Sequence, residues 1–294
     1  MRVLVAGCGY LGLPIALELA RQGHEVVGLR RTPAADSLPA DTPSIAWMTT
    51  DLTQPDGTLP EGRFDAVIFA LGGTCSAVLE GTRRLLAHFA AEPPTRYLHL
   101  GCTEVYGQTD GSVVKENHPT DPLTELGRAH VEAERLVLAA IRNRFPAVLL
   151  RVARIYGPGR EHDLAKFIRN EVRLAGQGHR NLNLIHLDDA VGGALAALKS
   201  GRPGEIYNLV DQEPVTEIHF FTWLAESLGK YVPPFAPPGE PGAKASIANA
   251  RISNRRLAME LGHRLKYPTF RQGMTAELKR LTEAGQLDIP REER

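Results

Sequence analysis

The sequence predicts an α/β protein: a doubly wound parallel sheet carrying a smaller α/β lobe formed by the C-terminal half of the chain. In the first half, short continuously apolar segments alternate with longer helical patterns, which is typical of a sheet buried on both faces. The 294 residues are enough for one large α/β domain or two smaller ones. The strands predicted in this half are residues 2–7, 25–30, 65–71, 96–101 and 147–152.

Helices are expected between these strands, at residues 11–22, 77–91 and 126–144. Strand–helix alternation implies parallel pairing with right-handed crossovers. The second half is less regular, and the Pro- and Gly-rich segment 232–244 is expected to be a loop. The elements predicted there are strands at 181–187 and 204–210 and helices at 162–175, 188–200, 216–229 and 253–262.

The overall composition is that of an ordinary globular chain and excludes several classes of function. Lys plus Arg equals Asp plus Glu at 34 each, so no basic field indicates a nucleic-acid partner or a membrane surface. No segment reaches the roughly 20 apolar residues that a membrane span needs. The three cysteines, Cys8, Cys75 and Cys102, favour reduced thiols in a cytoplasm over a disulfide framework. No His/Cys/Asp cluster has metal-ligand spacing, so no metal is expected.

A glycine-rich loop gives the strongest local signal. Gly7, Gly9 and Gly12 form a G-x-G-x-x-G motif directly after a predicted strand and at the start of a helix. The first glycine permits the tight turn, the second lets a pyrophosphate approach the backbone, and the third lets the helix pack closely on the strand. The helix N-terminus then presents free N–H groups to the phosphates. We therefore expect a Rossmann-type dinucleotide site whose loop also includes Tyr10 and Leu11.

The end of the second strand favours NADP(H), with NAD as the alternative. A site for NAD usually carries an acidic residue there, whereas this chain has Arg30 and Arg31, whose guanidinium groups suit a 2′-phosphate. Two solvated arginines are the competing interpretation, and Asp36 is near enough in sequence to contact a ribose. Asp51 either lies beside the adenine or only caps a turn. The other expected cofactor contacts are Leu52, Ala70, Leu71 and Gly72.

The chain divides accordingly into a nucleotide domain and a substrate lobe. Residues 1–155, with a returning segment near 181–212, are assigned to an NAD(P)-binding Rossmann domain. Residues 156–180 and 213–294 are assigned to a smaller substrate-binding lobe. The cleft between the two is the default binding site.

Seven motifs are spread over nearly the whole chain. They are GCGYLG (7–12), TDL (50–52), GCTEVYG (101–107), LLRVARIYGPGR (149–160), LIHLDDAVGGAL (184–195), GEIYNLVDQEPVT (204–216) and LG (261–262). Together they resemble the extended short-chain dehydrogenase/reductases of the NAD(P)-dependent epimerase/dehydratase group. In detail the chain is similar to the atypical, YeeZ-like members of that group. The resemblance implies subunit pairing through the helices near 77–91 and 126–144, and therefore a homodimer.

The resemblance also implies a catalytic Ser or Thr after the fifth strand and a Tyr-x-x-x-Lys pair on the next helix. In such a set the Tyr acts as acid or base, the Lys lowers its pKa, and the hydroxyl binds the reacting oxygen. This chain departs at all three positions, with Cys102, Leu126 and His130 in place of the Ser/Thr, Tyr and Lys. Because leucine cannot transfer a proton, the usual hydride chemistry cannot run in its usual form.

The candidates for chemistry are Cys102, Thr103, Glu104 and His130. In the dehydratase branch of the resembling group an acidic pair occupies the places of Thr103 and Glu104, so this chain keeps only the second acid. Glu104 is either a general acid or base, if burial raises its pKa, or a turn carboxylate. His130 either works in acid/base chemistry with Glu134 orienting its ring, or is an ordinary helix histidine. Cys102 is either a nucleophile or an inert thiol.

Three residues around the YGPGR turn are expected to bind substrate. Arg154 stands where sugar-nucleotide enzymes of the resembling group often carry a substrate-contacting Asn, and Arg154 and Arg160 flank the turn, where they can clamp an anion. Tyr156 either replaces the lost phenol or packs in the turn. Asp188 is expected to cap the helix at 188–200, and His186 to be a satisfied strand residue.

Two functions from different classes follow. The first is an NAD(P)-binding oxidoreductase or isomerase with a non-standard active site, acting on a nucleotide sugar or another anionic substrate. The second is a catalytically inactive NADP(H)-binding sensor or regulatory protein. The intact glycine loop with a broken Tyr-x-x-x-Lys pair suits the second, and the nearly complete cleft motifs suit the first.

Overall fold

A seven-stranded parallel sheet forms the centre of the protein in the computed structural model, which describes residues 1–32, 42–237 and 248–287. Asp36 lies outside the described residues. The strand order is β11-β7-β5-β4-β1-β2-β3, with neighbouring strands parallel throughout. The strands are β1 (Arg2–Ala6), β2 (Glu25–Arg30), β3 (Ala46–Thr49), β4 (Ala66–Phe69), β5 (Arg96–Cys102), β7 (Ala147–Val152) and β11 (Ile206–Leu209).

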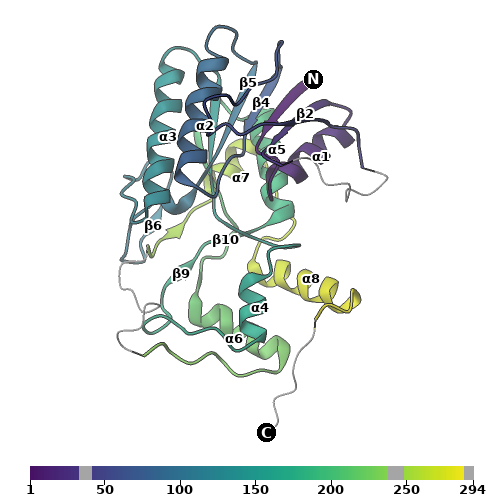
Figure 1. The fold of residues 1–294 in the computed structure, drawn as a ribbon. Helices are drawn as coiled ribbons and strands as arrows, with labels where there is room; N and C mark the ends of the chain where they lie inside the picture. Colours follow the sequence, from purple (N-terminus) through teal and green to yellow (C-terminus); the bar gives the residue numbers. More distant parts are fainter. Residues whose placement is uncertain (33–41, 238–247, 288–294) are drawn as a thin grey trace.

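Helices cover both faces of this sheet, as its continuously apolar strands require (Figure 1). Alternate residues of β1 serve opposite faces: Val3 and Val5 pack in one core cluster with Ile15, whereas Leu4 packs in another with Leu85. The helices of the first face are α1 (Gly12–Arg21) and α5 (Leu187–Ser200), and those of the second are α2 (Cys75–His88) and α3 (Glu125–Arg142). The predicted doubly wound α/β fold is therefore confirmed.

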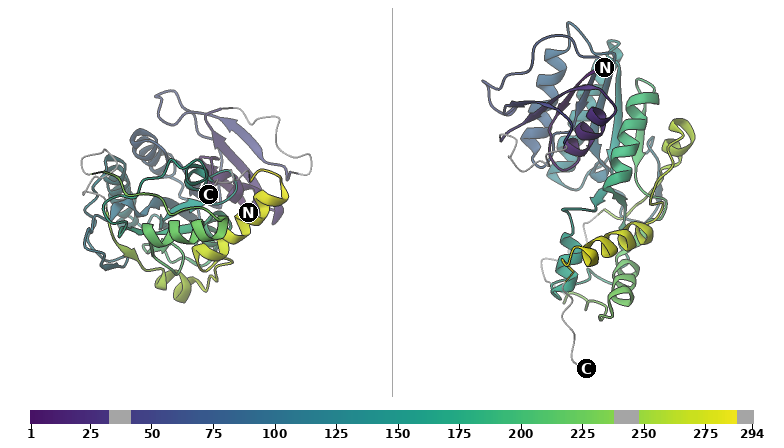
Figure 2. Two further views of the ribbon diagram at one scale, coloured as in Figure 1. Left: turned by 90° about the horizontal axis from the view of Figure 1, so that it is seen from below. Right: turned by 90° about the vertical axis from the view of Figure 1, so that its right-hand side faces the viewer.

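A smaller lobe lies beyond the carboxyl ends of the strands and has its own core cluster. Figure 2 shows it in the right-hand view as a body below the sheet, with the yellow helix α8 and the green helix α6 close together. Its elements are α4 (His162–Ile168), β9 (Asn181–Leu182), β12 (Val215–Thr216), α6 (Glu217–Leu228) and α8 (Phe270–Glu283). The remaining elements are η1 (Thr103–Val105), β6 (Val113–Val114), β8 (Arg154–Tyr156), β10 (Leu184–His186), β13 (Arg251–Ile252) and α7 (Arg255–Leu261).

Three local predictions are wrong. The helix expected at 162–175 ends at Ile168, because Asn170 adopts a left-handed φ of 58° that no helix can continue. Asp188 does not cap α5: His186 is the N-cap, and its Nδ1 accepts the Asp188 backbone N–H at 3.1 Å. The strand expected at 181–187 is broken into β9 and β10.

Helix α8 was not predicted, although its sequence carries a signal. Gln272, three residues after Thr269, accepts the Thr269 backbone N–H with its Oε1 at 3.1 Å. A Thr followed three residues later by Gln is the sequence form of a capping box.

Candidate functional site

The glycine loop between β1 and α1 has the geometry of a phosphate cradle. Gly7 adopts a φ of +103°, and a Cβ there would lie 2.7 Å from the Ala70 carbonyl. A Cβ on Gly12 would lie 2.1 Å from the Gly7 oxygen, whereas Gly9 has nothing within 4 Å of a Cβ position. The first and third glycines therefore permit tight packing, and the second leaves open space for a ligand. At the N-cap of α1, Leu11 supplies no side-chain hydrogen bond to the helix N–H groups.

A cavity of about 430 Å³ runs from this loop along the carboxyl ends of β1, β2 and β4. It collects the expected cofactor residues except Tyr10, Leu11 and Gly12. The expected residues that line it are Gly7, Gly9, Arg30, Arg31, Asp51, Leu52, Ala70, Leu71 and Gly72. The residues present therefore fit a dinucleotide: the glycine loop would hold its pyrophosphate, and Arg30 and Arg31 would lie near its adenosine.

Away from the glycine loop, the first cavity is lined by two arginines, Arg30 and Arg31, and by one carboxylate, Asp51. The Arg30 guanidinium lies over the Trp47 ring at 5.6 Å, and Arg31 is exposed. Asp51 accepts hydrogen bonds on Oδ1 from the backbone N–H and the hydroxyl of Thr53, at 2.9 and 2.8 Å, and these bonds lower its pKa. Asp51 thus forms a turn, as one of the two alternatives expected, and it also lines the first cavity.

A second cavity of about 390 Å³ opens beside β5, β7 and β8. It brings together Cys102, Thr103, Glu104 and Arg154 among the residues singled out from the sequence. His130, Tyr156 and Arg160 do not line it. The polar residues that it adds are Tyr106, Thr124, Arg180, Asn181 and Asn183.

Glu104 lies at the mouth of α3. Its Oε2 accepts a hydrogen bond from the Thr124 hydroxyl at 2.8 Å, and the same hydroxyl oxygen accepts the Gly127 N–H at 2.9 Å as the helix N-cap. Glu104 is exposed and shares this hydrogen bond with the helix N-cap, which agrees with the turn-carboxylate alternative. The carboxylate is nevertheless held in one place at the rim of the cavity.

Cys102 is a protonated thiol at neutral pH. Burial, and after it the charge of Glu104, raise the pKa of Cys102 to about 12. A nucleophilic cysteine needs the opposite environment. The geometry therefore favours the inert thiol over the nucleophile.

His130 lies inside the protein rather than in the cavity. It is 5% exposed, its Nδ1 has no hydrogen-bond partner among the described residues, and burial lowers its pKa to about 4. Glu134 does not orient its ring, because both carboxylate oxygens of Glu134 bind the buried Arg151, at 2.9 and 2.8 Å. The expectation of a His130–Glu134 pair is therefore wrong, and His130 is neutral at pH 7.

The three residues around the YGPGR turn are placed differently from one another. Arg154 reaches the second cavity and also forms an ion pair with Asp163, at 2.7 Å. Tyr156 is buried in the lobe core, in agreement with the packing alternative. Arg160 turns away towards the glycine loop, where its guanidinium lies over the Tyr10 ring at 4.2 Å.

Of the polar lining residues that the sequence analysis did not single out, three lie in one short segment, residues 180–183. Arg180 lines it while its Nη2 binds Glu217 at 3.0 Å. Asn181 donates from Nδ2 to Asn249 at 2.7 Å, and Asn183 donates from Nδ2 to the Ala250 carbonyl at 2.9 Å. The asparagines alternate with the buried Leu182 and Leu184. This period-two pattern would have placed both asparagines on one face of an extended segment.

Two kinds of feature are absent from the described residues. None of the described helices is long and apolar enough to span a membrane. Within residues 1–32, 42–237 and 248–287, no group of three His, Cys, Asp or Glu side chains is placed to hold a metal ion.

Comparison with known proteins extends the resemblance read from the motifs. The model of the NAD dependent epimerase/dehydratase family matches residues 3–209. The chain is 28% identical to protein YeeZ of Escherichia coli K12 over 279 residues, covering 91% of this chain and 96% of YeeZ. It is 27% identical over 314 residues to a 3-diazoavenalumate denitrifying reductase of a Streptomyces species, covering 94% of this chain and all of the reductase.

A solved structure agrees with the fold. A conserved protein of unknown function from Silicibacter pomeroyi superposes with a TM-score of 0.79 at 28% identity, covering 95% of this chain and 98% of the other. Membership of a family named for its NAD dependence supports a nicotinamide cofactor in the first cavity. The family model covers well over half of the chain, and the chain therefore belongs to the NAD dependent epimerase/dehydratase family.

Proposed function

We propose that this protein is an NADP(H)-dependent oxidoreductase or isomerase that acts on an anionic substrate in the second cavity. The observation that carries the proposal is the relation between the two cavities. The first is lined by residues that follow β4, and the second by residues that follow its hydrogen-bonded neighbour β5. A ligand in the first cavity and a ligand in the second would therefore lie next to each other at the carboxyl edge of the sheet, where open α/β sheets bind ligands.

The preference for NADP(H) rests on the end of β2. Arg30 and Arg31 both line the first cavity, and β2 ends without an acidic residue to accept the 2′-hydroxyl of NAD. Guanidinium groups bind a phosphate through charge-assisted, often bidentate hydrogen bonds.

Proton transfer is assigned to Glu104. When bound, the nicotinamide would donate or accept the hydride, so the chain has to supply alignment and a proton. Among the described residues that line the second cavity, Glu104 is the only carboxylate. The Thr124 hydroxyl holds the Glu104 carboxylate by a hydrogen bond to Oε2, and the other oxygen, Oε1, receives no hydrogen bond from Thr124. Thr103, the preceding residue in η1, lines the same cavity and can bind a substrate oxygen.

An anionic substrate fits the charges at the other side of the cavity. Arg154 and Arg180 both line it. Each already pairs with a carboxylate, Asp163 or Glu217, but one pairing leaves further N–H donors on each guanidinium. The Nε of Arg180 is buried and has no hydrogen-bond partner among the described residues.

The alternative, a cofactor-binding sensor without turnover, is favoured by the helix α3. Leu126 stands in the place of the family's Tyr, and the buried His130 in the place of its Lys. Neither can transfer a proton to the second cavity. We also propose a homodimer that pairs through α2 and α3, which light scattering after size exclusion would test.

Three measurements on the purified full chain test the proposal. Calorimetric titration with NADPH and NADH gives both affinities. Consumption of reduced cofactor is then followed with a panel of carbonyl acids, phosphorylated carbonyls and nucleotide sugars. Glu104→Gln keeps the hydrogen bond from Thr124 but removes the carboxylate, and we expect it to lower turnover by roughly 100-fold or more, with cofactor affinity unchanged.

The matched control is Glu125→Gln, which removes an exposed carboxylate from the first turn of α3 that does not line the cavity. It should leave turnover within twofold. Equal turnover of the Glu104→Gln protein and the wild type would contradict the proton-transfer role. Tight cofactor binding with no turnover on any substrate would favour the sensor. If neither cofactor binds below millimolar concentration, both functions are wrong.

A further inference from the structure

Arg160 is a cation from the C-terminal half of the chain that lies directly over the glycine loop. Its Cζ is 4.2 Å from the centroid of the Tyr10 ring. The backbone of the turn also approaches this ring, because a Cβ on Gly159 would lie 3.8 Å from it. Tyr10 stands between Gly9 and the N-cap of α1, so the contact joins the YGPGR turn to the centre of the phosphate cradle.

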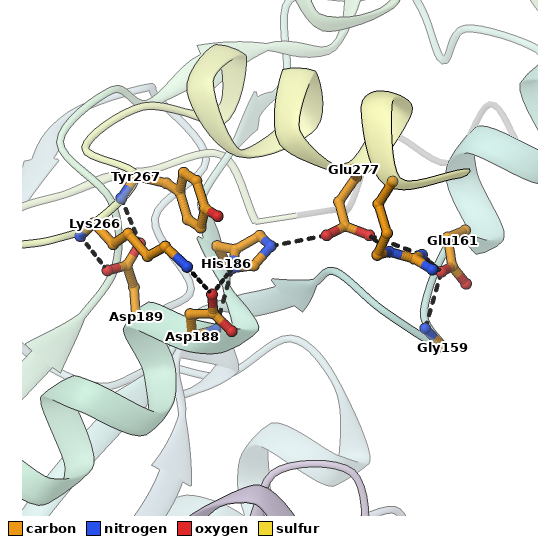
Figure 3. Close-up of polar contacts among 9 residues, drawn as sticks. Gly159, Glu161, His186, Asp188, Asp189, Lys266, Tyr267 and Glu277 are labelled. Carbon is orange, nitrogen blue, oxygen red and sulfur yellow. Dashed lines mark hydrogen bonds and ion pairs between the residues drawn. The ribbon is translucent and has the colours of Figure 1, made fainter. Parts of the chain in front are cut away.

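The turn that carries Arg160 is fixed by a line of polar contacts (Figure 3). Glu161 accepts the Gly159 N–H on Oε1 at 2.9 Å, and the same oxygen accepts a hydrogen bond from Arg280 at 2.5 Å. Arg280 also donates to Glu277 at 3.0 Å, and Glu277 lies 3.2 Å from His186 Nε2. The line therefore runs from α8 to the YGPGR turn and holds its backbone in place.

The tautomer of His186 agrees with this arrangement. Nδ1 accepts the Asp188 backbone N–H, so in the neutral ring the hydrogen is on Nε2 and is donated to Glu277. Within this line, Arg280 is the cation that both Glu161 and Glu277 bind. Arg160 is left outside it: among the described residues, its guanidinium has the Tyr10 ring as its contact and no ion pair or hydrogen bond.

We propose that Arg160 is a cofactor residue that binds the pyrophosphate of the dinucleotide at the glycine loop, with Tyr10 as the platform for its guanidinium. The sequence had suggested substrate binding for Arg160, but its side chain lines neither the second cavity nor the first, and its contact with Tyr10 is what brings it to the glycine loop. A pyrophosphate carries two negative charges, and the N-terminus of α1 offers it backbone N–H groups alone. A guanidinium over the loop supplies the charge and the paired donors that the helix lacks.

The proposal rests on the proposed cofactor site, so its test separates the two. Calorimetry on the full chain uses four ligands. NADPH, NADH and ADP-ribose contain a pyrophosphate, whereas adenosine 2′-monophosphate does not. We expect Arg160→Ala to weaken the first three by roughly 10-fold or more, as for loss of one charge-assisted contact, and to change the fourth by less than twofold.

Further variants separate charge from stacking. Arg160→Lys keeps the charge and should retain part of the affinity. Tyr10→Phe keeps the ring and should bind like the wild type, whereas Tyr10→Leu should weaken the pyrophosphate ligands. The control Arg173→Ala removes an exposed arginine of the same lobe, whose Nη1 binds only the carbonyls of Asn170 and Val172. Circular dichroism and thermal melting of each variant verify the fold.

The measured affinities either support the pyrophosphate role of Arg160 or contradict it. The proposal is wrong, and the cofactor site stands, if the wild type binds NADPH and Arg160→Ala binds all four ligands within twofold of it. It is also wrong if only NADPH and adenosine 2′-monophosphate weaken, because Arg160 would then bind the 2′-phosphate. If the wild type binds none of the four ligands, the proposed function fails and the proposal fails with it.

Discussion

We expect the buried ion pair between Glu134 and Arg151 to contribute strongly to the free energy of unfolding. Both side chains are almost fully buried, at 5% and 4% exposed. Arg151 donates from Nε and Nη2 to the two oxygens of Glu134, and from Nη1 to the Tyr106 hydroxyl at 2.8 Å and the Glu116 carbonyl at 3.1 Å. The pair joins α3 to β7, next to the strand that ends in Cys102.

Glu134→Leu removes two of these charge-assisted hydrogen bonds and leaves the guanidinium buried without its counter-ion. Two such bonds are worth ~1.5–3 kcal/mol each, which gives roughly 3–6 kcal/mol. Breaking a buried pair by removing one partner costs ~3–5 kcal/mol in other proteins, in agreement with this sum. Because Tyr106 and Glu116 still bind Arg151, we expect the lower half of the range, ~3–4 kcal/mol of unfolding free energy.

Urea unfolding followed by circular dichroism measures the loss. The double variant Glu134→Leu/Arg151→Met removes both charges and should lose less than the sum of the two single variants. The control is Glu132→Leu on the same helix, whose exposed partner Arg135 lies at 3.3 Å, and which should change stability by less than ~1 kcal/mol. A loss below ~1 kcal/mol for Glu134→Leu, or strict additivity in the double variant, would refute the reasoning.

Three further predictions concern the loop and two buried titratable groups. Gly12→Ala should lower both the melting temperature and the cofactor affinity, because its Cβ would lie 2.1 Å from the Gly7 oxygen, whereas Gly9→Ala, with nothing within 4 Å, should lower only the affinity. Burial lowers the pKa of His130 to about 4, below its unfolded value near ~6.5, so stability should fall by up to ~3 kcal/mol as pH drops from ~6.5 to ~4. His130→Gln should remove that slope in urea titrations at successive pH values, and an unchanged slope would contradict the assignment. Burial raises the pKa of Asp211 to about 8, so this group should cost stability as pH rises from ~4 to ~8, and Asp211→Asn should become the more stable protein towards pH 8 in the same titrations.

The parts of the fold that follow from short-range pattern were predictable. The continuous apolar run of β1 indicates a strand covered on both sides, and Val3 and Leu4 do face opposite core clusters. The positions of Gly7 and Gly12 similarly encode close backbone approach, because any Cβ there meets a carbonyl. These patterns can be recognised within one strand and the turn that follows it, although the carbonyl that Gly7 approaches belongs to Ala70 after β4.

The contacts of the charged side chains Arg151 and Arg160 were not predictable from the sequence, because each joins elements that lie apart in the chain. Glu134 is four residues after His130, so a helix-based argument couples them. The fold instead brings Arg151 of β7 to Glu134, and a guanidinium with a full charge is the stronger partner in a buried place. The contact between Arg160 and Tyr10 spans 150 positions, and nothing in either local sequence indicates it.

Helix α3 meets the second cavity at its N-cap, Thr124, and not through the side chain of His130. In the family's usual arrangement two side chains inside the helix meet the reacting atoms. Here the first of those positions is Leu126, and the second is the buried, neutral His130. The helix still serves the second cavity through its N-cap, since Thr124 fixes Glu104 by a hydrogen bond of 2.8 Å. We therefore expect any proton transfer in this protein to depend on a carboxylate at the mouth of the helix, so that Glu104→Gln lowers turnover whereas His130→Gln leaves both turnover and the pH–rate profile unchanged.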